Sequence, residues 1–295
     1  MSTLPTDTPA RDPDSPVDYD VAVVGGGAAG LAAATFTARY GLETVVFDGG
    51  KAAITQCAHV ENYLGFPGGV SPDRLLALGR AQVEHEGATV VDERVTGVSR
   101  HDGTGGFTVE TTDRALADRV VVAAAYDGDV FAPLDDALPE PEPFAPTDAG
   151  RTAAAGLYVA GWMSDETAHQ VGVNVGHGTR VGLALCRDDM SERYWPAVGE
   201  RYVDWVVHEG RYGGEGWDEH VDEWFDREML PSPEGVDTDL IAAAREDLKA
   251  EFLDREVDAD ERARRDREGQ RLLLERLDDN VVREYAATLE GIDDE

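Results

Sequence analysis

Lysine and cysteine are almost absent from this sequence of 295 residues. The lysines are Lys51 and Lys249, and the cysteines are Cys57 and Cys186. Two cysteines cannot form a disulfide framework, which favours a reducing compartment, and we expect the cytoplasm. No apolar run approaches membrane-spanning length, so we expect no membrane contact. Residues 1–18 are polar and proline-rich without a signal-peptide core, and we interpret them as a disordered tail.

Positive charge is scarce as well. There are 60 acidic against 26 basic residues, for a formal net charge of -34. The acidic residues are spread along the chain rather than gathered in one block, which favours adaptation to very high salt, as in a halophile. The alternative is an acidic protein made for a basic partner. No Lys/Arg patch rises above this background, so we expect no nucleic-acid partner.

A metal-ligand cluster is also missing from the sequence. Cys57 and His59 lie close together, but a structural zinc site needs four ligands. We therefore expect no metal site.

A glycine-rich turn between a strand and a helix organises the rest of the chain. The β-branched run 18–24 predicts a buried strand, and residues 31–40 are strong helix formers. Between them Gly25, Gly27 and Gly30 fit G-x-G-x-x-G, in which the glycines allow a tight turn, a close pyrophosphate and close helix packing. A second strand ends in Asp48, at the spacing expected for a carboxylate on a ribose. We favour a dinucleotide-binding βαβ unit over an ordinary glycine-rich turn.

Further elements follow in order along the chain. Residues 49–69 predict a long ordered loop, and Ser71 and Pro72 predict the start of a helix that runs to about residue 85. Strands are predicted at 88–91, 107–110, 119–125 and 156–161, with hairpin-type turn residues at 102–106. The composition shifts to Asp, Pro, Ala and Glu from 127 to 150, and residues 139–143 are linker-like. A helix is predicted from about 169 to 187. Its glycines (172, 176, 178 and 182) cost helix stability, so we expect them to allow close approach of a strand or ligand.

The region from 191 to 295 changes character and predicts an acidic, all-helical appendage. Two apolar stripes have helical spacing: Ile241, Ala244, Leu248 and Phe252, and then Leu273, Leu277, Val281, Tyr285 and Leu289. Such stripes usually pack into a core. We expect the appendage to pack on the nucleotide domain or on a second subunit.

The pattern from 18 to 187 resembles the thioredoxin-reductase-like group of flavoproteins, which have two dinucleotide-binding domains. The resemblance implies an α/β fold: a Rossmann-like FAD-binding domain with a ββα meander at 19–190, followed by the helical appendage. In that family the opening βαβ unit holds the ADP part of FAD. The resemblance therefore implies that Gly25, Gly27, Ala29 and Gly30 hold the pyrophosphate and that Asp48 holds the adenosine ribose.

Other blocks carry the same resemblance. The segment from His59 to Gly65 is similar to the family's Val-Glu-Asn segment, which implies that Asn62 lies beside the flavin. Val95 matches the position whose backbone reads the adenine. Residues 156–161, ending in Gly161, are similar to a strand near the end of the FAD domain, and Gln170 and Val171 match the pair at the start of the last helix, which faces the flavin pyrimidine.

The chain also departs from the family. Trp162 stands where the family has an aspartate that accepts bonds from the ribityl and phosphate region, and Ala53 replaces a glutamine near the flavin. The family inserts an NADPH domain, with a second glycine motif and a Cys-x-x-Cys pair, before the strand at 156–161. Here only residues 126–151 are available, so the chain looks like the FAD half alone.

The resulting expectation is a homodimeric FAD-dependent oxidoreductase with an unidentified electron donor and acceptor. The alternative is a non-catalytic FAD- or nucleotide-binding or regulatory protein. Cys57 is a candidate redox thiol and His59 a candidate proton relay, against the plainer interpretations of a semi-buried thiol and an ordered loop histidine. His169 and His177 flank the start of the last helix and are candidates for flavin contact or for solvent exposure. Cys186 is expected to be packing.

Overall fold

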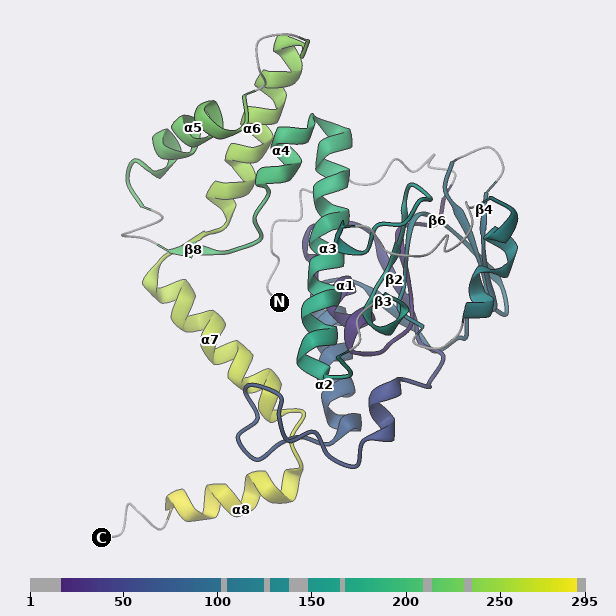
Figure 1. Ribbon diagram of the computed structural model, residues 1–295. Coiled ribbons are helices and arrows are strands. Elements are labelled where there is room, and N and C mark those ends of the chain that lie inside the picture. The colour runs from purple at the N-terminus through teal and green to yellow at the C-terminus, as the bar shows by residue number, and fades with distance from the viewer. Residues whose placement is uncertain are drawn as a thin grey trace. The chain divides into compact units, whose positions relative to one another are not determined.

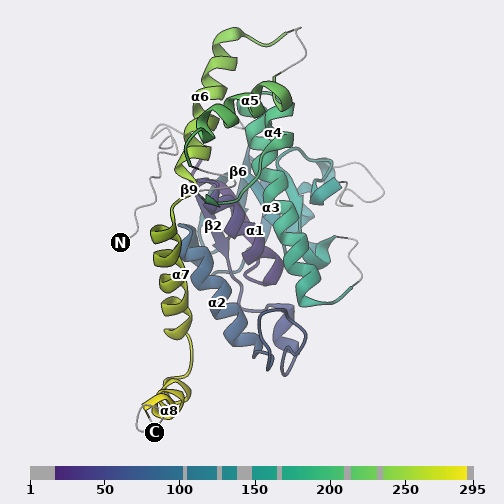
Figure 2. The same ribbon diagram turned by 90° about the vertical axis from the view of Figure 1, so that its left-hand side faces the viewer.

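The computed structural model describes residues 17–101, 105–124, 128–137, 148–164, 168–208, 214–230 and 235–290. The chain forms two compact units, unit 1 (residues 1–204) and unit 2 (residues 205–295) (Figures 1 and 2). Unit 1 extends beyond the predicted boundary at 190, because helix α3 (Val171–Arg193) continues through it and α4 (Pro196–Arg201) packs on α3. Almost all of the predicted tail lies outside the described residues.

A seven-stranded sheet forms the centre of unit 1. Its order is β3-β2-β1-β6-β5-β4, and β7 pairs with the C-terminal part of β6. The pairs β1–β2, β1–β6, β2–β3 and β6–β7 are parallel, whereas β4–β5–β6 form an antiparallel meander. The strands are β1 (Tyr19–Val24), β2 (Thr44–Phe47), β3 (Thr89–Val91), β4 (Gly97–Arg100), β5 (Phe107–Glu110), β6 (Arg114–Val122) and β7 (Leu157–Val159). The Rossmann-like α/β class predicted from the sequence is confirmed.

Each face of the sheet has its own apolar core. Val21 and Val23 of β1 point to the face covered by α1 (Ala28–Arg39), α2 (Pro72–His85) and α3. Ala22 and Val24 point to the opposite face, where the meander packs. The alternation along β1 follows from the two-residue repeat of a strand, and burial on both sides explains its continuous apolar run.

Two glycines of α3 allow it to cross α1 closely (Figure 1). A Cβ at Gly178 would lie 2.1 Å from the carbonyl oxygen of Ala29, and one at Gly182 would lie 2.7 Å from that of Ala33. Gly176, on the same helix, has no atom within 4 Å of such a Cβ. The predicted close approach is therefore real at two of the four glycines, and the partner is a helix rather than a strand.

Several sequence-based element predictions need correction. Strand β4 was missed, and the strand predicted at 119–125 begins at Arg114 and ends at Val122. No element was predicted at 128–137, where η2 (Gly128–Ala137) is a 3-10 helix whose Val130, Phe131 and Leu134 are buried in the core. Their apolar spacing was hidden by the surrounding Asp and Pro residues. The Pro-Glu repeat at 139–143 lies outside the described residues.

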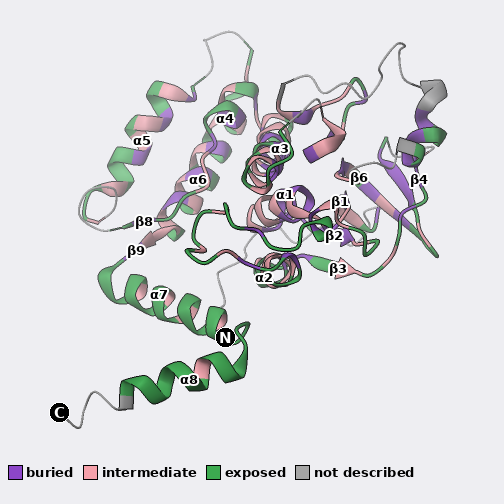
Figure 3. Ribbon diagram, turned by 60° about the horizontal axis from the view of Figure 1, so that its bottom comes forward, coloured by how far each residue is buried: buried purple, intermediate pink, exposed green. Residues whose placement is uncertain are grey.

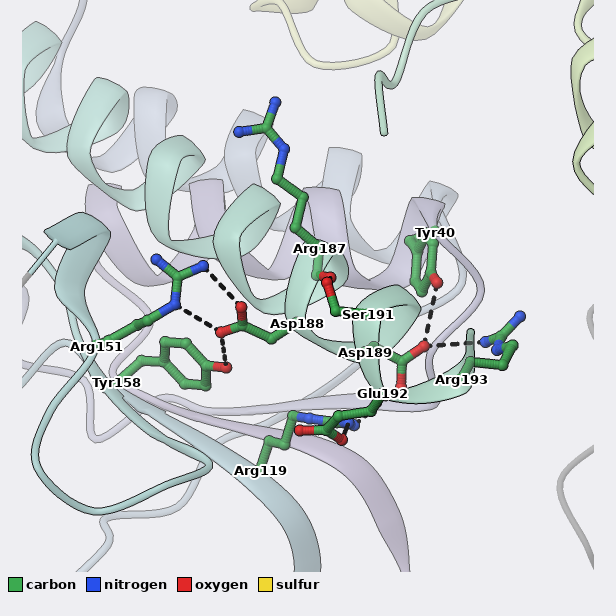
Figure 4. Close-up of polar contacts among 10 residues, drawn as sticks. All are labelled: Tyr40, Arg119, Arg151, Tyr158, Arg187, Asp188, Asp189, Ser191, Glu192 and Arg193. Carbon is green, nitrogen blue, oxygen red and sulfur yellow. Dashed lines mark hydrogen bonds and ion pairs between the residues drawn. The ribbon is translucent and has the colours of Figure 1, made fainter. Parts of the chain in front are cut away.

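The acidic C-terminal end of α3 is neutralised by arginines from elsewhere in unit 1 (Figure 4). Asp188 accepts two hydrogen bonds of 2.7 Å from Arg151 and one of 2.7 Å from the hydroxyl of Tyr158. Burial first, and then the bond to Asp188, raises the pKa of Tyr158, which keeps its phenol protonated. Carboxylates at a helix C-terminus oppose the helix dipole, so these partners remove an unfavourable interaction.

A second network lies one residue further along α3 (Figure 4). Asp189 pairs with Arg119 at 3.1 Å and with Arg193 at 2.9 Å, and it accepts a 3.1 Å hydrogen bond from the hydroxyl of Tyr40. Arg119 also pairs with Glu192 at 2.6 Å. The two networks tie α3 to α1, to β6 and to the segment before β7.

Unit 2 is helical, with one pair of two-residue strands, β8 (Val207–His208) and β9 (Glu256–Val257). Helix α5 (Trp217–Glu228) packs against α6 (Thr238–Asp254) through Phe225, Leu248 and Phe252, with Trp224 edge-on to Phe252. Ala244, Leu248 and Phe252 are buried, as the first apolar stripe predicts. The other helices are α7 (Ala259–Leu274) and α8 (Asp279–Glu290).

The second apolar stripe is exposed, which contradicts the expectation of core packing. Leu273, Leu277, Val281, Tyr285 and Leu289 are all among the exposed large apolar side chains (Figure 3). Helical spacing identified an apolar face, but none of the residues that the structure describes buries it, and packing on a second subunit stays a prediction. Among the residues that the structure describes, none of the helices combines the length and apolarity needed to cross a lipid bilayer.

Candidate functional site

A cavity of about 360 Å³ opens where the carboxyl ends of β1, β2, β6 and β7 meet. Its walls come from the turns after these strands, from the loop after β2 and from the N-termini of α1 and α3. Ligands of parallel α/β sheets bind at this edge, because the strand-to-helix turns gather there. The lining includes the whole glycine turn from Gly25 to Ala29 and Asp48.

Each glycine of the G-x-G-x-x-G turn is required for a different local reason. Gly25 has φ +118°, and a Cβ there would lie 2.6 Å from the carbonyl oxygen of Ala123. A Cβ at Gly30 would lie 1.9 Å from the carbonyl oxygen of Gly25. Gly27 is different, since a Cβ there would meet only the Cβ of Ala52, at 3.7 Å. Packing within the protein therefore explains Gly25 and Gly30, whereas Gly27 leaves open space over the start of α1.

The helix N-termini at the cavity carry no protein counter-charge. Helices α1 and α3 have no side-chain N-cap bond and no acidic residue in the first turn. In contrast, α2, α5, α6, α7 and α8 all carry an acidic residue in the first turn. Free N–H groups and the positive dipole end attract anions. Two uncompensated helix N-termini thus meet at one cavity of a chain with net charge -34.

Three charged side chains line the same cavity: Asp48, Lys51 and Arg94. Asp48 follows β2 and accepts a 2.8 Å hydrogen bond from the backbone N–H of Gly50. A Cβ at Gly26 would lie 2.3 Å from Cγ of Asp48, so the carboxylate is held directly against the glycine turn. Two cations and one anion give the cavity a local positive balance. That balance suits a ligand with both hydroxyl and phosphate groups.

A side-chain hydrogen bond ties the loop after β2 to the start of α3. Nδ2 of Asn62 donates a 2.7 Å hydrogen bond to Oε1 of Gln170, the N-cap residue of α3. Within the loop, Nε2 of His59 donates to the carbonyl oxygen of Gly68 at 3.1 Å. Cys57 is exposed and lines the cavity, after the 3-10 turn η1 (Ala53–Gln56). The loop is thus braced at two points, and Cys57 lies at the cavity.

An aromatic pair lines the cavity beside the N-terminus of α3. The rings of Trp162 and His169 lie 4.2 Å apart at 32°. Gly161, before Trp162, has φ +66°, and its N–H donates to Nδ1 of His177 at 3.1 Å. His169 therefore belongs to the site, and His177 holds the turn that presents Trp162.

The predicted site residues fall into two groups. Those that line the cavity are Gly25, Gly27, Ala29, Asp48, Cys57, Val95, Gly161, Gln170 and Val171. Gly30, His59 and Asn62 do not line it: Gly30 packs α1 on β1, His59 braces the loop, and Asn62 holds Gln170. Cys186 is buried, which raises the pKa of its thiol well above the ordinary value, as expected for a packing residue.

Sequence reasoning missed Lys51, Arg94 and Asn174, all of which line the cavity. The rarity of lysine was a usable signal for Lys51, because one of the two lysines stands three residues after Asp48. Asn174 is buried, and its Nδ2 donates to the carbonyl oxygen of Gln170 at 2.8 Å. Within the described ranges, no three His, Cys, Asp or Glu side chains are grouped so as to hold a metal ion.

Residues 19–133 match the pyridine nucleotide-disulphide oxidoreductase family. The chain is also similar to NADPH-dependent thioredoxin reductase 3 of Arabidopsis thaliana, with 33% identity over 111 residues. Its identity to thioredoxin reductase of Streptomyces coelicolor is 34% over 124 residues. A solved thioredoxin reductase from Gloeobacter violaceus has the same fold, with a TM-score of 0.55 and 17% identity over 64% of this chain and 98% of that one. Residues 19–133 are therefore similar in sequence to this family, and the chain shares the fold of the solved thioredoxin reductase.

The sequence similarity covers only part of each protein. It spans 36% of this chain and 21% of the Arabidopsis relative, and 40% of this chain and 38% of the Streptomyces relative. The family match ends at residue 133, inside η2 and far before unit 2. The glycine turn and Asp48 lie within the matched residues, whereas Trp162 and the N-terminus of α3 do not.

Proposed function

We propose that this protein is an FAD-dependent oxidoreductase that receives electrons from a separate donor rather than from a nicotinamide bound on its own second domain. The observation that carries the proposal is the meeting of two uncapped, acid-free helix N-termini and Asp48 at one cavity. In a chain with a large excess of acid, such a site favours a dinucleotide with a doubly charged pyrophosphate. The same proposal places the protein in the cytoplasm, of a halophile.

The residues present fit FAD at its ADP end. Gly27 leaves room over the first turn of α1, where the pyrophosphate would lie, and Asp48 is an acceptor for the adenosine ribose hydroxyls. Val95 is buried at the cavity wall, on the side assigned to the adenine. Bound FAD would supply the electron transfer, and the chain would bind, orient and shield it.

The short connection between β6 and β7 supports a separate electron donor. Strand β6 ends at Val122 and β7 begins at Leu157, and η2 within the connection contributes to the core of unit 1. Hydride transfer needs a nicotinamide held against the flavin at close range, which takes a binding site of its own. We therefore propose a reduced partner protein or a small diffusible reductant as the donor.

The first test is the visible spectrum and an FAD titration of the chain purified in multimolar KCl. We expect flavin absorbance and saturable FAD uptake. Asp48→Ala removes the ribose acceptor and should weaken FAD binding by about 10- to 100-fold. Asp92→Ala is the matched control, because Asp92 follows β3 as Asp48 follows β2, but it pairs with Arg80 at 2.5 Å and does not line the cavity. A colourless protein that takes up no FAD would contradict the proposal.

The second test concerns the reductant. In stopped-flow mixing, dithionite should bleach the bound flavin, whereas NADH and NADPH should give slow, non-saturating reduction. Cys57→Ser should keep the flavin content and abolish any turnover that depends on a disulfide, if the thiol takes part. Fast, saturable bleaching by NADPH would show that a nicotinamide site exists and that a separate donor is not required.

A second candidate function rests on Trp162 and His169. The two rings line the cavity in tilted contact, and Trp162 stands where the family has an acceptor for the ribityl and phosphate region. A protein that binds the ADP part of a nucleotide without redox turnover would have the same α1 turn and Asp48. Competition between ADP and FAD separates the two functions: equal affinities would favour the non-catalytic binder, and much tighter binding of FAD would favour the oxidoreductase.

A further inference from the structure

Helices α7 and α8 and the turn between them carry a series of exposed apolar side chains, which we call the α7–α8 stripe: Leu273, Leu274, Leu277, Val281, Tyr285 and Leu289. Each is between 41% and 66% exposed. Helix α7 has no buried residue among its 16, and Figure 3 shows both helices exposed along almost their whole length. An apolar face of this extent is rare on a protein that works alone.

The polar sides of the two helices are satisfied within each helix. Arg264 pairs with Glu261 and Glu268, and Arg271 pairs with Glu275. On α8, Arg283 pairs with Asp279 at 3.0 Å. Asp279 stands two residues before Val281, and Arg283 stands two residues from both Val281 and Tyr285, which is roughly the opposite side of the helix. The stripe is therefore the face of α8 that lacks a partner, while the opposite face is provided with ion pairs.

Unit 1 offers little to cover the stripe. Among its described residues, Leu64 is the single large apolar side chain in the exposed class. The other exposed large apolar side chains of the described chain belong to unit 2. The apolar surface that matches the stripe in size is the stripe itself, on another copy.

The local charge also favours a second copy. Residues 259–290 hold nine acidic and seven basic residues, for a net charge of -2, in a chain whose net charge is -34. Two such segments can approach without the repulsion that opposes contact elsewhere on this surface. In a two-fold arrangement each stripe meets the same stripe, and charges of both signs flank it.

The exposed area is sufficient for a small but specific interface. From the exposed fractions, the six side chains present roughly 600 Å² per copy, so pairing buries about 1,200 Å², the lower limit for stable protein interfaces. Buried area alone does not fix the affinity, because association also costs rigid-body and side-chain freedom, so we expect a stable dimer to engage the whole stripe. Because screening by salt removes repulsion and salting-out strengthens apolar contacts, association should increase with salt.

We propose that the α7–α8 stripe is the interface through which two copies of this chain form a dimer. This proposal is independent of the flavin site and of the redox function. It assigns to unit 2 a role in assembly, and it gives a reason for the near-neutral composition of the last two described helices.

Light scattering of the full chain in multimolar KCl, after size exclusion, tests the dimer. The wild-type chain should have the mass of two copies at tens of micromolar. The double variant Val281→Glu/Tyr285→Glu should be monomeric, with dissociation increased at least 100-fold. Leu64→Glu is the matched control, since it places the same charge on the exposed apolar residue of unit 1, and it should stay dimeric. Circular dichroism should remain unchanged, because neither altered residue is buried.

Cross-linking locates the interface. In a Cys57→Ser background, Val281→Cys should be joined between copies by a short bismaleimide, whereas Glu223→Cys on α5 should not. A wild-type monomer would overturn the proposal, whether the stripe is free or covered by another part of the same chain. A dimer that persists in the Val281→Glu/Tyr285→Glu variant would overturn it equally, because the interface would then lie elsewhere.

Discussion

Units 1 and 2 carry the same formal charge and are stabilised in different ways. Residues 1–204 hold 31 acidic and 14 basic residues, and residues 205–295 hold 29 and 12, so each unit has a net charge of -17. Unit 2 distributes that charge over fewer than half as many residues. Unit 1 has a sheet with a core on each face, whereas unit 2 has one helix pair with a small core and two exposed helices.

This difference predicts that unit 1 is the more stable unit and that unit 2 is the more sensitive to salt. Burial rises with the size of a compact unit, so unit 1 can tolerate repulsion that a small unit cannot. Within unit 2 the excess charge is concentrated before α7, since residues 205–258 hold 17 acidic and five basic residues. We therefore expect unit 2 to need high salt for its fold, and unit 1 to need it less.

The largest expected effect is the selective unfolding of unit 2 when salt is lowered. Going from 1 M to 0.1 M salt extends the screening length from about 3 Å to about 10 Å, which exposes α5 and α6 to their own repulsion. Limited proteolysis should then cleave beyond residue 204 while unit 1 stays intact. Melting temperatures that do not change between 0.1 M and multimolar salt would refute this, and so would simultaneous loss of both units.

Next in size is the effect of filling the α1–α3 crossing in unit 1. Gly178→Ala forces a Cβ against the carbonyl oxygen of Ala29 and should lower the free energy of unfolding by about 3 kcal/mol. Gly176→Ala, two residues away with free space, should raise it by up to about 1 kcal/mol, because alanine favours the helix. Chemical denaturation in multimolar KCl measures both. Equal effects of the two changes would mean that α1 and α3 leave room for a Cβ at Gly178.

Removing the half-buried carboxylate of Asp188 should lower the free energy of unfolding by less than Gly178→Ala does. Asp188→Asn removes the charge that holds Arg151 and Tyr158, and we expect unit 1 to lose about 2 kcal/mol. Glu261→Gln on α7 removes a carboxylate that also serves two arginines, Arg264 and Arg265, but on an exposed helix. It should leave the unfolding of unit 1 unchanged. A larger loss of stability from Glu261→Gln than from Asp188→Asn would contradict the expectation that the carboxylate in unit 1 contributes more to stability than the one in unit 2.

Each unit contains one lysine. Substituting each in turn compares the effect on FAD affinity of losing a cation at the cavity with that of losing a surface ion pair. Lys51→Gln should weaken FAD binding by about fivefold, roughly 1 kcal/mol, and flatten its salt dependence, because a cation at the cavity is lost. Lys249→Gln breaks the 2.7 Å pair with Asp222 on α5 and should not change FAD affinity. Isothermal titration with FAD at several KCl concentrations tests both. Unchanged affinity in Lys51→Gln would remove this lysine from the site.

The smallest effect is a pH dependence of α7. Hydrogen bonds from Arg264, and then from Arg265, lower the pKa of Glu261 to about 2. A carboxylate whose pKa falls on folding stabilises the folded form above its unfolded pKa, near 4.3, and loses that contribution as the pH falls towards 2. Helicity measured by circular dichroism should decline slightly over this range in the wild-type chain. The decline should be smaller in Glu261→Gln.

The local features of the site could be predicted from the sequence. Which residues from separate segments come together at the cavity could not. Gly25, Gly27 and Asp48 were found because strand, turn, helix and acid follow one another within about 30 residues, and each has a backbone or charge requirement that few other residues meet. Lys51 and Arg94 were missed, because their relevance depends on a cavity that forms only when β2 and the segment before β4 come together. The ring contact between Trp162 and His169 likewise joins the segment after β7 to the start of α3.

The sequence by itself determined the βαβ unit, the class of fold, the acidic surface and the helical nature of the last hundred residues, since these follow from local propensity and periodicity. Only the tertiary structure decided which apolar faces are covered. Val130, Phe131 and Leu134, within a stretch for which no element was predicted, lie in the core, whereas the α7–α8 stripe lies exposed. The physical reason is that periodicity reports a face that gains from burial, but not the surface that will bury it.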